Sequence, residues 1–159
     1  SGKHIPVTDV VSPETRSRMM SGIRGTDTKP EITIRKKLHA LGFRFRLHSK
    51  KLPGKPDIVL PRYRAVIFVN GCFWHLHECH LFKWPATRPD FWQAKLSANR
   101  INDHLHLEQL EKMGWRVLVI WECALKGKTR LPVEDVISET VSWLKSDLKH
   151  KTLEGKKAG

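Results

Sequence analysis

The fold depends most on residues 56–70, which read PDIVLPRYRAVIFVN. Residues 56–60 and 65–70 are short apolar runs on either side of a turn over 61–64, and they predict two buried strands that pair in antiparallel fashion. Just upstream, residues 43–48 alternate Phe or Leu with Arg or His. This alternation predicts a third, half-buried strand with a basic outer face, which completes an antiparallel meander.

Four helices are expected around these strands, over residues 12–23, 29–41, 89–113 and 132–150. The second has the clearest boundaries, because Thr28 and Glu31 form a capping box and Gly42 stands where a helix can end. The third helix connects the meander to another buried strand, over 115–121, and such a crossover favours parallel pairing. The order of elements predicts one α/β domain, with a mixed sheet flanked by helices.

Composition limits the partners of this domain. The 159 residues include 29 Lys and Arg against 16 Asp and Glu, a formal net charge of +13. A polyanion is the expected partner, with nucleic acid favoured over an anionic membrane surface. No apolar run is long enough to cross a bilayer. We expect a flexible arm over 1–11, a folded domain over 12–148 and a basic, frayed tail over 149–159.

Cysteine usage indicates a reducing compartment, because the three cysteines cannot all pair with one another in one chain. Residues 71–80, GCFWHLHECH, lie in a long irregular loop, and His77 and Cys79 can converge there on one ion with the distant Cys123. This chemistry suits tetrahedral Zn²⁺. His75, His80 and Cys72 are competing ligands. The alternative is that the cysteines are small buried apolar residues and the histidines lie on the surface.

Asp57 is the second candidate for metal chemistry. It stands at the start of a predicted strand, after a basic loop, and neighbouring elements can bring Glu31 or the carbonyl of residue 69 close to it. Such an acid can hold Mg²⁺ against a scissile phosphate. A turn or capping Asp after Pro is the plainer alternative.

Aromatic residues are dense between positions 73 and 92, and their spacing does not follow the period of a strand. Apolar side chains flanked by basic residues can insert between base steps and unstack a duplex. The candidates for such wedges are Phe73, Trp74, Trp84, Phe91 and Trp92, and Met19 and Met20 on the basic first helix are two more. Packing over the metal loop as a small satellite core is an equally good interpretation.

Taken together, these motifs resemble the very-short-patch repair (Vsr) endonucleases. The resemblance rests on Asp57, GCFWH at 71–75 and WEC at 121–123, and it extends from about residue 12 to 148. PATR at 85–88, Phe91, Trp92, Lys95, Asn99 and Asp103 also match. The family implies a variant of the PD-(D/E)XK nuclease core and an enzyme that nicks DNA beside a T:G mismatch left by deamination of 5-methylcytosine.

The resemblance also implies catalytic roles. Asp57 would bind Mg²⁺ with help from the backbone carbonyl of Val69, His75 would activate the attacking water, and Glu31 would orient water in the outer shell of the metal. Asn70 departs from relatives that have an ionisable residue at this position. An Asn side chain donates a hydrogen bond but cannot carry a proton, so the rate or its pH dependence is expected to differ.

The remaining residues carried over from the family concern zinc and DNA. The zinc ligands would be His77, Cys79, Asp103 and Cys123. The wedges would be Phe73, Trp74 and Trp92 from the major groove and Met20 from the minor groove, which lets Lys95 and Asn99 reach the mismatched bases.

The sequence thus predicts a monomeric, cytoplasmic, bacterial enzyme associated with the nucleoid. Its substrate would be double-stranded DNA with a T:G mismatch, and accessory mismatch-repair proteins are possible partners. Its products would carry a 5′-phosphate and a 3′-hydroxyl. Two alternatives are kept: a site-specific nickase or a restriction or homing enzyme acting on matched duplex, and a zinc-containing DNA-binding module without catalysis.

Overall fold

The computed structural model describes residues 28–77, 79 and 81–156. The elements within them are α2 (Lys29–Ala40), β1 (Arg46–Leu47), β2 (Ile58–Leu60), the 3₁₀ turn η1 (Pro61–Tyr63), β3 (Ala65–Asn70), α3 (Pro89–Lys112), β4 (Arg116–Trp121), the 3₁₀ turn η2 (Glu122–Ala124), α4 (Val133–Leu144) and β5 (His150–Leu153). The expected arm, the first basic helix and Met20 lie outside the described residues.

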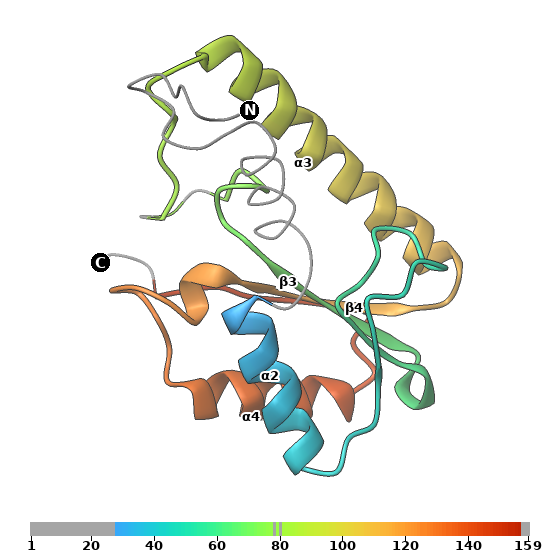
Figure 1. Ribbon diagram of the computed structural model, residues 1–159. Coiled ribbons are helices and arrows are strands. Elements are labelled where there is room, and N and C mark those ends of the chain that lie inside the picture. The colour runs from blue at the N-terminus through green and yellow to red at the C-terminus, as the bar shows by residue number, and fades with distance from the viewer. Residues whose placement is uncertain (1–27, 78, 80, 157–159) are drawn as a thin grey trace, which may run out of the picture.

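One mixed sheet organises the structure, with strands in the order β1-β2-β3-β4-β5. The pairs β1–β2 and β2–β3 are antiparallel, which confirms the predicted meander. The pair β3–β4 is parallel, with Ala65 opposite Arg116 and Asn70 opposite Trp121. The long helix α3 makes the crossover between them, as the sequence predicted (Figure 1).

Helices cover both faces of this sheet (Figure 1). On one face, α2 and α4 pack over a core to which the sheet contributes Ile58, Ile67 and Leu118 among others. On the other face, Leu110 of α3 packs with Val66 and other strand residues. The alternation along each strand therefore assigns its residues to two separate cores, as expected for a sheet buried on both sides.

The boundaries of α2 follow the predicted capping signals. The Oγ1 of Thr28 accepts a hydrogen bond from the backbone N–H of Glu31 at 3.4 Å. After Leu41, Gly42 takes φ +97°, a left-handed conformation that ends the helix with little strain. The cap matters for function because it fixes Glu31 in the first turn.

Two predictions about the ends of the sheet were wrong. Strand β1 contains only Arg46 and Leu47, both exposed, because Phe43 packs instead against Tyr63 with ring centroids 5.6 Å apart. The tail after residue 148 was expected to fray, but His150–Leu153 forms β5, parallel to β4. The expected helix over 132–150 accordingly ends at Leu144, and the added strand covers the edge that β4 would otherwise expose.

Among the described helices, none combines the length and the apolar composition that a membrane span requires.

Candidate active site and metal centre

The first functional group joins Glu31, His48 and Asp57, and one ligand atom of each lies within 4.8 Å of the others. Glu31 comes from the first turn of α2, His48 follows β1 and Asp57 precedes β2. Glu31 is only 1% exposed. A buried carboxylate next to a second one needs compensating partners, which are either hydrogen-bond donors or a cation.

Donors surround both carboxylates. The Oε2 of Glu31 accepts from Nη1 of Arg35 at 2.9 Å and lies 2.6 Å from Nε2 of His48. The Oδ2 of Asp57 accepts from the backbone N–H of Val69 at 2.7 Å. Burial raises the pKa of Asp57 to about 7; the Val69 hydrogen bond opposes this shift, and Glu31 adds to it. Near neutral pH Asp57 is therefore partly protonated, and a bound cation would displace that proton.

The second group pairs His75 with Asp103. His75 lies in the turn after β3, and its Nδ1 hydrogen-bonds Oδ2 of Asp103 from α3. Both residues, with Asn70, line a pocket of about 540 Å³ between α3 and the sheet. Because Asp103 engages Nδ1, the other ring nitrogen of His75 is the one left to exchange a proton with a substrate or water.

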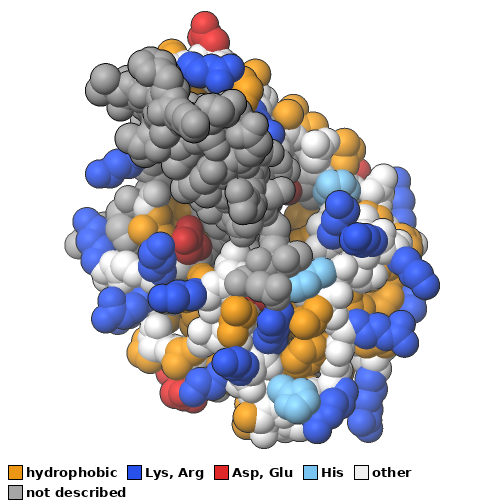
Figure 2. Space-filling view, in the orientation of Figure 1, with side chains coloured by type: hydrophobic (Ala, Val, Ile, Leu, Met, Phe, Trp, Pro, Cys, Tyr) orange, Lys and Arg blue, Asp and Glu red, His pale blue; other side chains and the backbone are white. Residues whose placement is uncertain are grey.

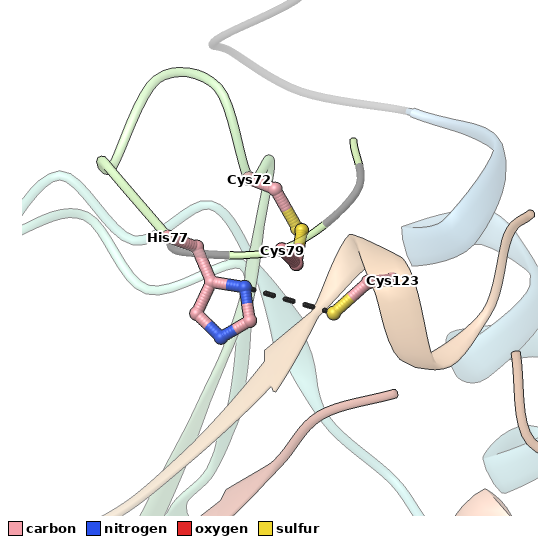
Figure 3. Close-up of side chains that lie close together, drawn as sticks. All are labelled: Cys72, His77, Cys79 and Cys123. Carbon is pink, nitrogen blue, oxygen red and sulfur yellow. Dashed lines mark hydrogen bonds between the residues drawn. The ribbon is translucent and has the colours of Figure 1, made fainter. Parts of the chain in front are cut away.

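The third group is a cluster of three cysteines and one histidine, shown in Figure 3. One ligand atom each of Cys72, His77, Cys79 and Cys123 lies within 4.8 Å of the others. The Nδ1 of His77 is 3.6 Å from Sγ of Cys123. Burial raises the pKa of the Cys72 and Cys123 thiols, so ionised thiols here require a cation. Three thiols and an imidazole converging on one point fit tetrahedral Zn²⁺ with no open position.

This cluster changes the expected ligand set. Asp103 was expected as a zinc ligand, but it is not a member of the cluster and instead hydrogen-bonds His75. Cys72, which the residue pattern had left as a competing ligand and which lies two residues after the end of β3, is the fourth member of the cluster. Spacing along the sequence could not decide whether Asp103, on a helix, or Cys72, in a loop, is the fourth ligand.

His48 is a member of the carboxylate group that the sequence analysis missed. It stands in the alternating stretch next to β1, where it was interpreted as one more residue of a basic outer face. Its backbone N–H donates to the carbonyl of Asp57 at 3.1 Å, while its ring reaches Glu31. Only the strand register, with Leu47 opposite Ile58, brings these residues together.

The aromatic residues form one cluster. The ring centroid of Phe73 lies 5.1 Å from that of Trp74, 5.8 Å from that of Phe82 and 5.4 Å from that of Trp92. Trp74 is only 5% exposed, whereas Phe73 and Trp92 are half-buried. The satellite-core interpretation therefore describes Trp74, and the wedge hypothesis is kept for the two partly accessible rings.

The two α3 residues expected near the bases have different surroundings. Asn99 donates from Nδ2 to the backbone carbonyl of Trp74 at 3.1 Å, so it fastens the aromatic loop to the helix. Lys95 stands one turn earlier on the same helix and is partly exposed.

Basic side chains are prominent on the face of the molecule shown in Figure 2. Lys and Arg lie along its left, lower and right-hand parts, with few acidic residues between them. This distribution matches the net charge of +13 and suits a phosphate backbone.

Comparison with known proteins identifies similar chains. Residues 8–81 match the family described as DNA mismatch endonuclease Vsr. The DNA mismatch endonuclease Vsr of Escherichia coli is 43% identical over 136 residues, covering 86% of this chain and 87% of that protein. The type II nicking enzyme V.XorIIP of Xanthomonas oryzae is 49% identical over 119 residues, covering 75% and 88% respectively. The nicking enzyme V.NmeAIP of Neisseria meningitidis is 43% identical over 122 residues, covering 77% and 87%.

Proposed function

Because the chain belongs to the Vsr family of DNA mismatch endonucleases and is a DNA nicking endonuclease, we propose that it cuts one strand of a duplex beside a T:G mismatch. The observation that carries this proposal is that a buried carboxylate group, a His–Asp pair and a Cys/His cluster occur together. They lie at one end of β2, β3 and β4 and in the loop that follows β3. The mismatch would arise by deamination of 5-methylcytosine. We also place the mixed sheet in the PD-(D/E)XK class.

The carboxylate group is the proposed Mg²⁺ site, with Asp57 and the backbone carbonyl of Val69 as ligands. If bound there, Mg²⁺ would supply positive charge to the scissile phosphate and the leaving oxygen. Glu31, which is held by Arg35 and His48, orients water beside it. Oxygen ligands of this kind are those that Mg²⁺ prefers.

His75 is the proposed general base. Asp103 accepts the Nδ1 hydrogen bond of its ring, which presents Nε2 to the attacking water and stabilises the imidazolium that forms. Asn70 lines the same pocket and donates a hydrogen bond to the phosphate. The expected products carry a 5′-phosphate and a 3′-hydroxyl.

The Cys72–His77–Cys79–Cys123 cluster is the proposed structural zinc site. With four protein ligands it leaves no position for substrate, so its role is to fix the loop after β3. That loop carries both His75 and Phe73, and zinc would therefore set the positions of the base and of one of the two wedges.

Recognition of the mismatch is proposed to depend on poor stacking. A T:G wobble pair is easier to separate from its neighbours than a matched pair, so inserting Phe73 and Trp92 there costs less. In this proposal Lys95 and Asn99, which follow Trp92 along α3, contact the same bases, Asn99 through a side chain that also holds the Trp74 carbonyl. We propose that the enzyme acts as a monomer in the bacterial cytoplasm, on nucleoid DNA, with accessory repair proteins.

A nicking assay tests the proposed substrate. End-labelled duplexes carrying T:G in several methylation-site contexts would be compared with T:A and C:G controls in Mg²⁺. We expect cleavage of the thymine strand of T:G duplexes alone, and loss of that cleavage in His75→Ala. Equal cutting of matched duplexes would instead establish a site-specific nickase, an outcome for which the names of several relatives give reason.

Separate replacement of Trp92 and of Trp74 distinguishes a role in mismatch recognition from a role in stability. Trp92→Ala is expected to slow T:G nicking by about tenfold, since one stacking contact contributes about 1–3 kcal/mol. Trp74→Ala removes a buried ring and is expected to lower the free energy of unfolding by about 3 kcal/mol. Urea unfolding curves and single-turnover nicking of both variants check this. Equal losses of stability would contradict the assignment of Trp92 as a wedge.

A further inference from the structure

The end of the described chain lies against the Cys/His cluster. After β5, the backbone N–H of Gly155 donates to Sγ of Cys123 at 3.3 Å. The backbone N–H of Lys156 donates to the carbonyl of Thr129 at 2.8 Å, and this bond fastens the segment beside η2. The segment that was expected to fray therefore contacts the proposed metal ligands.

His77 is oriented from two sides. Its Nδ1 faces Cys123, and its Nε2 lies 3.7 Å from Oε1 of Glu154, the residue directly after β5. Its ring stacks on Trp121 with centroids 4.2 Å apart and an interplanar angle of 16°. A carboxylate beside the far nitrogen favours the tautomer in which Nε2 carries the proton and Nδ1 is the ligand.

Gly155 is required by space as well as by its N–H group. A Cβ at this position would lie 2.5 Å from the Cys123 carbonyl oxygen and 2.5 Å from Oγ1 of Thr129. Any side chain therefore displaces the segment from the cluster, and the hydrogen bond to the sulfur lengthens.

We propose that residues 154–156 form a C-terminal clasp that supplies the outer shell of the metal centre: Glu154 orients His77, and the Gly155 amide stabilises the Cys123 thiolate. This inference rests on the proposed zinc site. N–H donors lower the energy of thiolate lone pairs, and outer-shell partners typically contribute tenfold to a hundredfold to metal affinity. The clasp thus makes retention of zinc depend on a segment more than thirty residues away from Cys123 in the sequence.

The test measures the rate of zinc release from the purified protein to a chromogenic chelator. A chain ending at Leu153 should release zinc about tenfold or more faster than wild type, and a chain ending at Lys156 should match wild type. Glu154→Gln, which keeps the shape of the side chain, should release zinc several-fold faster. Glu139→Gln is its charge-matched control, because Glu139 contacts Lys151 of β5 and not the cluster.

A second readout separates this role from simple loss of folding. In the cobalt-substituted protein, Gly155→Ala should move the thiolate-to-cobalt charge-transfer band to longer wavelength while the far-ultraviolet circular dichroism spectrum stays unchanged. Equal release rates for zinc-loaded wild type and the chain ending at Leu153 would overturn the clasp alone. A wild-type protein that binds no zinc would overturn the metal centre, and the clasp with it.

Discussion

Asp57→Asn is expected to reduce Mg²⁺-dependent nicking by about a thousandfold while T:G duplex binding stays close to that of wild type, because Asn does not supply the anionic ligand that holds the metal. The amide keeps the size of the carboxylate, and its oxygen can still accept the hydrogen bond from Val69. Single-turnover nicking and a filter-binding titration in Ca²⁺ measure the two properties. Nicking at the wild-type rate would remove Asp57 from the metal site.

The same substitution is expected to stabilise the fold at high pH. The pKa of Asp57 rises from 3.8 to about 7 on folding, so the folded protein binds this proton more tightly than the unfolded chain does. The contribution of Asp57 to the free energy of unfolding is therefore largest below its unfolded pKa, and it is lost as pH rises toward about 7. At pH 8 the ionised Asp57 lies beside buried Glu31, and Asn removes that cost. The expected gain is about 2 kcal/mol, or roughly 4–8 °C in Tm.

Two controls belong to this measurement. At pH 4 the gain should shrink, because Asp57 is then protonated in the folded state. Added Mg²⁺ should stabilise wild type at pH 8 and leave Asp57→Asn unchanged, since only the carboxylate binds it. A variant that is less stable than wild type at pH 8 would contradict this prediction. It would show that the ionised Asp57 carboxylate stabilises the fold without a bound cation.

Local sequence patterns predicted most of the fold. The Thr28 capping box and the apolar run at 65–70 each encode their element within a few residues, and both elements are present. The end of the chain was not readable in this way. His150–Leu153 has a basic, mixed composition, and only the exposed edge of β4 makes it a strand.

The candidate sites show the same division. Asp57 and the loop at 71–79 were identified from residue type. Their partners in the structure reach them through strand register and through the crossover helix α3. His48 reaches Glu31 through strand pairing, and Asp103 reaches His75 from the middle of α3. Neither contact leaves a periodic signal in the sequence. A side chain that acts across elements is found only when the elements are placed.

Cys72→Ser and Asp103→Asn are expected to fail in opposite ways. Cys72→Ser removes a buried thiol from the cluster, so zinc content should fall to a small fraction of wild type and the free energy of unfolding by several kcal/mol. Asp103→Asn leaves the cluster complete and should retain zinc. It should slow nicking by about a hundredfold or more, because the His75 ring loses the carboxylate that orients it.

Zinc content by atomic emission, unfolding curves and single-turnover nicking distinguish the two variants. Loss of zinc from Asp103→Asn, with zinc retained in Cys72→Ser, would restore Asp103 as the fourth ligand. The expected result is that Cys72→Ser loses zinc and Asp103→Asn retains it. This would separate a metal centre that builds the loop from a His–Asp pair that acts on the water, although one short turn carries residues of both.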